Sequence, residues 1–164
     1  MNKLFSALFF ISVLHAAVYA QTNNTQVKFK ELSYGYYSSE TVEKEQSDDL
    51  PTGGHKVIKN QVLVKQTNKV PAKIGTEFGT VYQLKGRSKD SVQLDIEWIY
   101  PREIVDPKKN AAYKNVRYSL YVPGNLTNGS TYTLEEPFEV VTGEWQLNIF
   151  NKGNLLYSKK FVLE

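Results

Sequence analysis

Hydrophobic and polar residues alternate along many short segments of this chain, most clearly over residues 92–100. Every second residue there is hydrophobic: Val92, Leu94, Ile96, Trp98 and Tyr100. A period of two places one set of side chains on a buried face and the other on a solvated face, as in a half-buried β-strand. Similar patterns predict strands in or near 27–36, 57–66, 69–75, 78–84, 116–122 and 131–134.

Residues 138–163 are predicted to form the closing strand pair. Trp145, Leu147 and Ile149 alternate with Glu144, Gln146 and Asn148. The composition of 151–154, with Gly153 among them, is typical of a hairpin loop. We therefore expect Trp145 to be a core residue and the hairpin to be part of the scaffold.

Three stretches lack this alternation. Residues 40–59 are rich in carboxylates and contain a Pro-Thr-Gly-Gly segment at 51–54, which indicates a solvated loop. Residues 101–115 contain two prolines and are expected to be an irregular connection, with one helical turn near Ala111–Ala112. Residues 125–130 are expected to form a loop.

Pro71 has no N–H group to donate to a strand ladder, so its segment belongs at an edge or at a strand start.

Seven to eight short strands without helical periodicity predict an all-β protein. The favoured architecture is an antiparallel immunoglobulin-like β-sandwich, and a small closed barrel is the alternative. The chain contains no cysteine, so the cysteine–tryptophan–cysteine spacing of antibody domains is absent.

The first 20 residues have the layout of a secretory signal peptide. Lys3 gives a positive start, residues 4–14 form an apolar run, and Val18-Tyr19-Ala20 fits a cleavage site. A membrane anchor is the alternative, but the run is too short to span a hydrocarbon core of about 30 Å. We expect cleavage after Ala20, export to the periplasm or the exterior, and no later membrane span. Residues 21–31 are then a polar lead-in and the start of the first strand, and residues 32–164 a single domain.

Composition restricts the chemistry further. Among 164 residues there is no cysteine, and His55 is the one histidine beyond the signal segment, so no usual zinc site can form. The acidic residues near Asp48 do not have the spacing of an EF-hand loop. We expect no cofactor and no bound metal. The net charge of +3 is small and scattered, which argues against nucleic acid as a partner.

The best candidates for catalysis are Asp95, Glu97 and His55. Asp95 and Glu97 share a strand face, and carboxylate pairs carry out glycoside hydrolysis. That face is predicted to be the solvated one, where acids keep ordinary pKa values. His55 has no serine or carboxylate placed beside it in the sequence. We therefore expect no catalytic residues and no enzyme activity.

Tyrosine is abundant, with 11 residues. Exposed tyrosines suit contact with sugars or proteins, whereas tyrosine is also a common strand residue. Tyr113, in the irregular connection, and Tyr121, on the polar side of its strand, are the candidates for a contact surface.

Four segments resemble an uncharacterised bacterial family, DUF3859, a domain of unknown function. They are Tyr34-Gly35-Tyr36-Tyr37, the Pro-x-x-x-Gly-x-x-x-Gly stretch within 70–79, Pro137-Phe138-Glu139-Val140-Val141, and Thr142-Gly143-Glu144-Trp145. The resemblance covers about residues 32–163 and leaves out the acidic stretch and the lead-in. It implies an exported, immunoglobulin-like domain with no assigned activity. It also implies that Gly75 and Gly79 serve turns or close approach, and Phe78 and Trp145 the core.

The expected function is a non-catalytic interaction module of the bacterial envelope that binds a protein or a glycan. Two alternatives remain open at this point. One is a secreted carbohydrate-active hydrolase using Asp95, Glu97 or His55. The other is a structural or assembly subunit that joins others through an exposed strand edge.

Overall fold

The computed structural model describes residues 27–46, 54–86 and 91–164, so the proposed signal segment 1–20 lies outside it. The described part contains nine strands and one short 3-10 turn, η1. Their bounds are β1 Lys28–Gln46, β2 Gly54–Lys65, β3 Lys69–Val70, β4 Glu77–Lys85, β5 Ser91–Asp106, β6 Ala111–Pro123, β7 Thr127–Thr133, η1 Pro137–Glu139, β8 Gly143–Asn151 and β9 Asn154–Leu163. Within these ranges, no helix has the length and apolar character to cross a bilayer.

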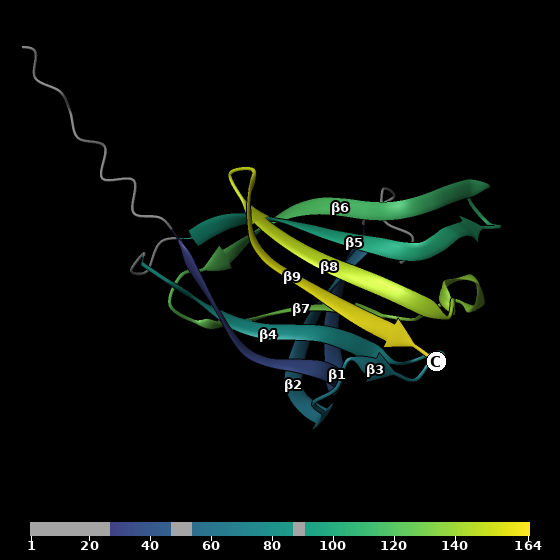
Figure 1. Ribbon diagram of the computed structural model, residues 1–164, viewed down its shortest axis with the longest axis horizontal. Helices are drawn as coiled ribbons and strands as arrows, with labels where there is room; N and C mark the ends of the chain where they lie inside the picture. Colours follow the sequence, from purple (N-terminus) through teal and green to yellow (C-terminus); the bar gives the residue numbers. More distant parts are fainter. Residues whose placement is uncertain (1–26, 47–53, 87–90) are drawn as a thin grey trace, which may run out of the picture.

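The strands form two sheets packed face to face (Figure 1). The four-stranded sheet has the order β2-β1-β4-β7 and the five-stranded sheet the order β3-β9-β8-β5-β6. Neighbouring strands are antiparallel except β3 and β9, which are parallel. The predicted all-β immunoglobulin-like sandwich is confirmed, and the strand number is nine rather than seven to eight.

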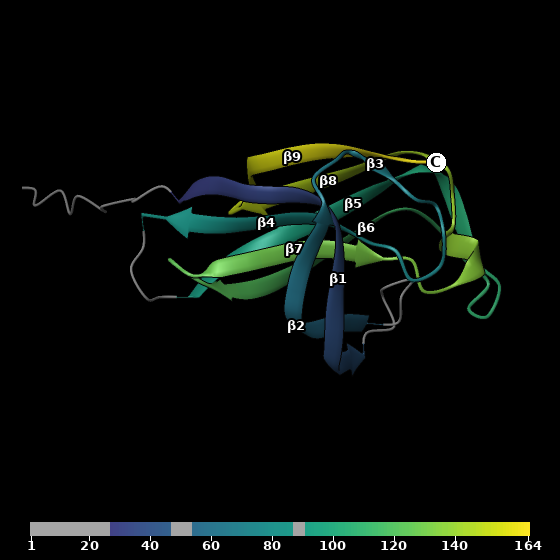
Figure 2. The ribbon, with the colours of Figure 1, turned by 90° about the horizontal axis from the view of Figure 1, so that it is seen from below.

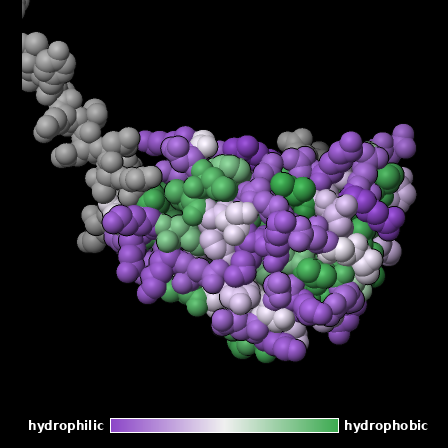
Figure 3. All heavy atoms as spheres, in the orientation of Figure 1, coloured by the Kyte–Doolittle hydropathy of each residue, from purple (hydrophilic) through white to green (hydrophobic). Residues whose placement is uncertain are grey.

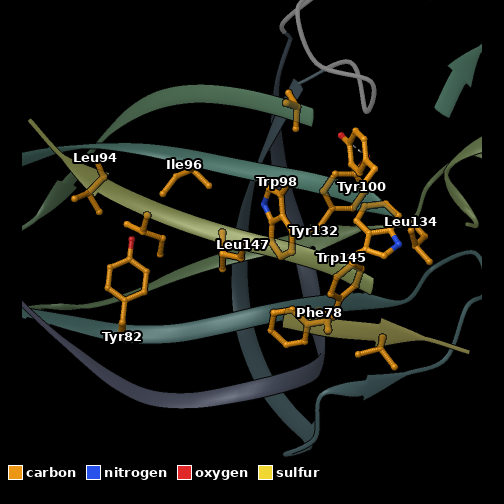
Figure 4. Close-up of a cluster of buried hydrophobic side chains, with 14 of the residues drawn as sticks. Phe78, Tyr82, Leu94, Ile96, Trp98, Tyr100, Tyr132, Leu134, Trp145 and Leu147 are labelled. Carbon is orange, nitrogen blue, oxygen red and sulfur yellow. Dashed lines mark hydrogen bonds between the residues drawn. The ribbon is translucent and has the colours of Figure 1, made fainter. Parts of the chain in front are cut away.

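The core lies between the two sheets and is rich in aromatic rings (Figure 4). Phe78 on β4 is fully buried, with its ring centroid 5.3 Å from that of Trp98 and 5.6 Å from that of Trp145. Both contacts are edge-to-face, the arrangement that aromatic quadrupoles favour. The predicted core roles of Phe78 and Trp145 are therefore confirmed.

Gly79 allows β4 and β7 to approach each other closely. A Cβ atom at this position would lie 2.2 Å from the carbonyl oxygen of Ser130, and the φ angle is +155°. Only glycine fits such a contact without moving the backbone. Gly75, with a φ of +85°, lies in a turn, so both interpretations of these glycines are confirmed.

The closing strand pair is shorter than predicted at its start. Residues 137–139 form η1, and β8 begins at Gly143. Phe138 is therefore not a strand residue, because Pro137 at the first position of the turn starts a 3-10 helix instead. The loop to β9 is a two-residue turn: Asn151 pairs with Asn154, and Lys152 and Gly153 have φ angles of 50° and 79°. Positive φ at both central residues is what a type I′ hairpin requires.

The expected irregular connection over 101–115 is wrong. β5 continues to Asp106 and β6 begins at Ala111, so most of this stretch extends a hairpin. The alternation is lost because β5 bulges between Ile99 and Ile104, where Pro101 lies. The expected loop over 125–130 is also partly wrong, since β7 begins at Thr127 and pairs with β4.

β1 leaves the sandwich half-way along its length. Its first part pairs with β4 from Lys28 to Tyr37, and its second part pairs with β2 as far as Gln46. Bulges between Tyr36 and Glu43 accompany this change of partner. The second part of β1 and β2 together form a two-stranded ribbon that extends away from the two sheets (Figure 2).

The ribbon corrects the loop expected over residues 40–59. Both ends of this stretch are strand, in β1 and in β2, and residues 47–53 lie outside the described part. The carboxylate-rich sequence is compatible with a strand pair because the β1 backbone finds its hydrogen-bond partners in β2.

Candidate functional site: a polar face on the five-stranded sheet

The side of the five-stranded sheet that faces away from the core carries polar side chains from four strands, with the half-buried Ile99 and Phe150 among them. We call it the polar face. Its members come from four neighbouring strands: Gln93, Asp95 and Glu97 of β5, Asn115, Arg117, Ser119 and Tyr121 of β6, Gln146 and Asn148 of β8, and Ser158 of β9. On β5 they alternate with the buried residues Leu94, Ile96 and Trp98. The strand period therefore produces the core and the polar face together.

Asp95 is held by two neighbours on β6. Ser119 Oγ donates to its Oδ1 atom over 2.6 Å, and the Arg117 guanidinium contacts its Oδ2 atom at 3.2 Å. The Ser119 hydrogen bond and the positive charge of Arg117 lower the pKa of Asp95, because both favour the ionised form. The Arg117 guanidinium carbon also lies 4.6 Å from the centroid of the Phe150 ring, which fixes the arginine in place.

Glu97 lies at the centre of a chain of hydrogen bonds that crosses the sheet. Asn115 Nδ2 donates to one of its carboxylate oxygens over 3.1 Å and Asn148 Nδ2 to the other over 2.9 Å. Gln146 Nε2 continues the chain to Asn148 Oδ1 at 2.9 Å and to Ser158 Oγ at 3.0 Å. Four strands are thereby linked through side chains alone, and each polar group is held in one orientation.

These contacts decide what the two carboxylates can do. A general acid at neutral pH needs a raised pKa, whereas that of Asp95 is lowered. Glu97 already accepts a hydrogen bond at each oxygen. Hydrogen-bond donors and acceptors that are already fixed in the free protein are suited to ligand binding. They lose little conformational entropy when a ligand binds.

Tyr121 is the one large hydrophobic residue of the polar face that is exposed, with 72% of its surface accessible. Its hydroxyl contacts Gln93 Oε1 at 3.5 Å. Around Asp95 and Glu97, in residues 93–99, 115–119 and 144–150, no large hydrophobic side chain is exposed. Hydrophilic side chains cover most of the side of the molecule shown in Figure 3, and hydrophobic ones form separate patches.

The other sequence candidates do not join this face. His55 belongs to β2 in the four-stranded sheet, where its backbone is paired with that of Glu45. The structure does not describe its side chain. Tyr113 is half-buried and packs against the core, opposite Ile104. The structure thus brings together Asp95, Glu97 and Tyr121, but neither His55 nor Tyr113.

Sequence reasoning missed the partners of the two carboxylates. Arg117 and Ser119 lie on a strand whose alternation was recognised, yet their pairing with Asp95 depends on the register between β5 and β6. Glu97 and Asn148 are opposite each other in the β5–β8 ladder although far apart in sequence. The sequence feature that could have located these residues was the polar set of side chains in each alternating strand. Within the described residues, no group of three or more metal-binding side chains occurs.

The fold and the exposed polar sheet define an immunoglobulin-like β-sandwich protein. The chain belongs to the family DUF3859, a domain of unknown function, whose model matches residues 25–163. The match includes the acidic stretch that the sequence resemblance left uncovered. No curated protein sequence matches the chain.

One similar solved structure is an immunoglobulin-like protein from Pseudomonas aeruginosa. It superposes with a TM-score of 0.62 and 28% sequence identity, over 85% of this chain and 97% of that one. The similarity covers nearly the whole of the neighbour.

Proposed function

We propose that this chain is an exported, non-catalytic binding module that holds a neutral saccharide against the polar face. The observation that carries the proposal is the hydrogen-bonded network that spans four strands around Asp95 and Glu97. Export is supported by the signal-like pattern of residues 1–20.

A saccharide fits the chemistry of this surface. Each sugar hydroxyl can donate and accept a hydrogen bond, and the polar face offers carboxylate, amide, guanidinium and hydroxyl groups in fixed positions. Arg117 pairs with Asp95, and the asparagine amides that donate to Glu97 leave both carboxylates as fixed acceptors beside fixed donors. The exposed Tyr121 ring offers a flat surface for the apolar side of a sugar ring.

A protein ligand fits less well. Protein interfaces usually have an apolar centre that is depleted of charged residues, with a polar rim around it. The polar face has a different arrangement. Charged and amide groups are exposed at its centre, where Ile99 and Phe150 are only half-buried, and the exposed apolar residues Val105 and Leu155 lie near its ends.

The experiment applies the purified protein to a glycan array and, in parallel, to immobilised proteins of a bacterial envelope extract. Tyr121→Ala is expected to weaken glycan binding by at least about tenfold, the loss that corresponds to ~1.4 kcal/mol. Asp95→Asn, which keeps the shape but not the charge, is expected to weaken it as well. Leu126→Ala is the matched control, because Leu126 is 59% exposed and precedes β7 in the other sheet.

The possible results separate the candidates. Glycan binding that survives Leu126→Ala and is lost in Tyr121→Ala supports the proposal. If an envelope protein is retained and Tyr121→Ala abolishes its retention, the polar face is a binding surface, but its ligand is a protein and not a saccharide. Hydrolysis of a glycan that stops in Asp95→Asn would overturn the non-catalytic assignment.

A further inference from the structure

The polar face carries more negative than positive charge. Its charged residues are two acids, Asp95 and Glu97, and one base, Arg117, so one negative charge is in excess. At the border of the face, on β8 and β9, Glu144 and Lys160 pair with each other at 2.7 Å and add no net charge. The excess charge therefore belongs to one of the two carboxylates on β5.

Arg117 neutralises Asp95 and not Glu97. In the ladder between β5 and β6, Arg117 lies directly opposite Glu97. Its guanidinium nevertheless reaches diagonally to Asp95, at 3.2 Å, and lies over the ring of Phe150, the residue opposite Asp95 on β8. Among the residues that the structure describes, no lysine or arginine forms an ion pair with Glu97. The uncompensated charge of the polar face is therefore that of Glu97.

The carboxylate of Glu97 is held in place by the sheet. Asn148, only 7% exposed, donates to one oxygen over 2.9 Å, and Asn115 donates to the other over 3.1 Å. Asn148 is fixed in turn, because its own oxygen accepts a hydrogen bond from Gln146. An ionised carboxylate has about four acceptor positions, so each oxygen of Glu97 keeps room for a hydrogen bond from a ligand.

We infer that Glu97 determines the specificity of the polar face: it accepts a hydroxyl of a neutral saccharide and excludes saccharides that carry acid groups. This inference rests on the saccharide-binding function proposed above and adds the class of sugar that the site rejects. A hydroxyl that donates to a carboxylate forms a charge-assisted hydrogen bond, which is stronger than a neutral one. A carboxylate of the ligand in the same place has no proton to donate at neutral pH and brings two like charges together, which weakens binding.

Arg117 does not offset this exclusion. Its charge is already balanced by Asp95, so a ligand carboxylate gains little net attraction from the guanidinium. An acidic sugar that took Arg117 for itself would leave Asp95 without its cation. Removing one partner of an ion pair at a binding surface weakens the complex, so both carboxylates on β5 disfavour an acidic ligand.

The test compares Glu97→Gln with the matched control Glu40→Gln. Glutamine has nearly the size of glutamate and keeps an oxygen for the Asn148 amide, but it has no charge. Glu40 is an exposed carboxylate on β1 in the other sheet, and it accepts a hydrogen bond from the Asn60 amide over 3.0 Å. Both substitutions change the net charge of the protein equally. The natural chain and the two variants are applied to a glycan array with matched pairs, in which a neutral hexose is replaced by the corresponding hexuronic acid.

The natural chain should retain the neutral member of a pair and not the acidic one. Glu97→Gln should weaken binding of the neutral member and strengthen binding of the acidic one, so the acidic-to-neutral affinity ratio should rise at least about tenfold. Glu40→Gln should leave this ratio unchanged. A purely structural role of Glu97 would weaken both members together.

Salt provides a second measurement of the same charge. Raising NaCl from about 0.05 M to about 0.5 M shortens the distance over which charges act, so the ratio should rise for the natural chain. It should change little for Glu97→Gln, which has no charge at this position.

The outcomes distinguish this inference from the proposed function. If neutral glycans bind but Glu97→Gln leaves the ratio unchanged, or if the natural chain retains acidic members as tightly as neutral ones, Glu97 does not set the specificity, while the saccharide site stands. An equal rise of the ratio in Glu40→Gln would also overturn the inference, because the net charge of the protein would then be responsible. If the natural chain retains no glycan at all, the inference and the proposed function are both wrong.

Discussion

The hydroxyl of Tyr132 donates a hydrogen bond of 2.7 Å to the carboxylate of Glu139, and both side chains are buried in the sandwich. The other carboxylate oxygen accepts the backbone N–H groups of Glu135 and Glu136, each at 2.8 Å. The carboxylate therefore fixes the start of η1 and ties it to β7. Burial raises the pKa of Glu139, and these hydrogen bonds oppose the rise.

The first prediction concerns pH. Because the pKa of Glu139 is higher in the folded than in the unfolded state, the folded state keeps its proton longer. The free energy of unfolding should then fall as pH rises from the ordinary carboxyl range, about 4.3, towards the raised pKa of Glu139. Urea titrations at several pH values measure this for the natural chain and for Glu139→Gln. The difference in the free energy of unfolding between the natural chain and Glu139→Gln should change with pH over that window. A constant difference would contradict a raised pKa of Glu139 in the folded state.

The second prediction concerns the contact between β9 of the five-stranded sheet and β1 of the four-stranded sheet. Lys159 Nζ of β9 lies 3.2 Å from the centroid of the Tyr34 ring and 3.3 Å from Glu31 Oε2, both on β1. Lys159→Met should lower the free energy of unfolding by ~1 kcal/mol, since this pair is partly shielded from solvent.

The control for Lys159→Met is Lys69→Met. Lys69 pairs with Glu164 at 3.4 Å, but both side chains are more than half exposed. Chemical denaturation should show almost no change for this variant. Equal losses in the two variants would mean that the Lys159 contacts contribute no more than an exposed ion pair.

The third prediction is a stabilising substitution. Lys152 has a φ of 50° in the type I′ turn, a conformation that asparagine adopts more readily than lysine. Lys152→Asn creates an Asn-Gly turn and should raise the free energy of unfolding by ~0.5 kcal/mol. Thermal unfolding should show a higher midpoint. A lower midpoint would indicate that the Lys152 side chain makes a contact worth more than the turn preference.

The fourth prediction concerns the attachment of the ribbon. Glu77→Ala leaves the donors Ser39, Gln61 and Thr131 without their acceptor, at a cost of ~1–3 kcal/mol. Amide hydrogen exchange should become faster in β2 than in β8 and β9. Glu144→Ala, which removes an exposed ion pair with Lys160, is the control and should change neither region. Uniform acceleration in all strands would show that Glu77 supports the whole sandwich.

The features predicted correctly from the sequence were those that depend on the alternation of buried and exposed side chains within a single strand. Residues 92–100 alternate because one side of β5 faces the core along the whole segment. Trp145 and Phe78 were recognisable as core residues because each is a large ring within such a pattern. The exposure of Tyr121 followed from the same period.

The features that were missed depend on irregular backbone or on distant residues. The bulge around Pro101 interrupts the alternation, so the extended β5–β6 hairpin looked like a loop. The change of partner along β1 has no local signature, because each half is paired with a different strand. The network around Glu97 requires Asn115 and Asn148, whose positions follow only from the register of three strands.

The parallel pairing of β3 with β9 has a consequence for the order of folding. Lys69 pairs with Val162 and Val70 with Leu163, although most of the chain separates them in sequence. β9 also completes the ladder with β8. The sandwich can therefore close only after β9 has been synthesised and is free to pair. Sheets with such long-range pairing fold in roughly milliseconds to seconds, so an open chain with β3 unpaired should persist until β9 arrives.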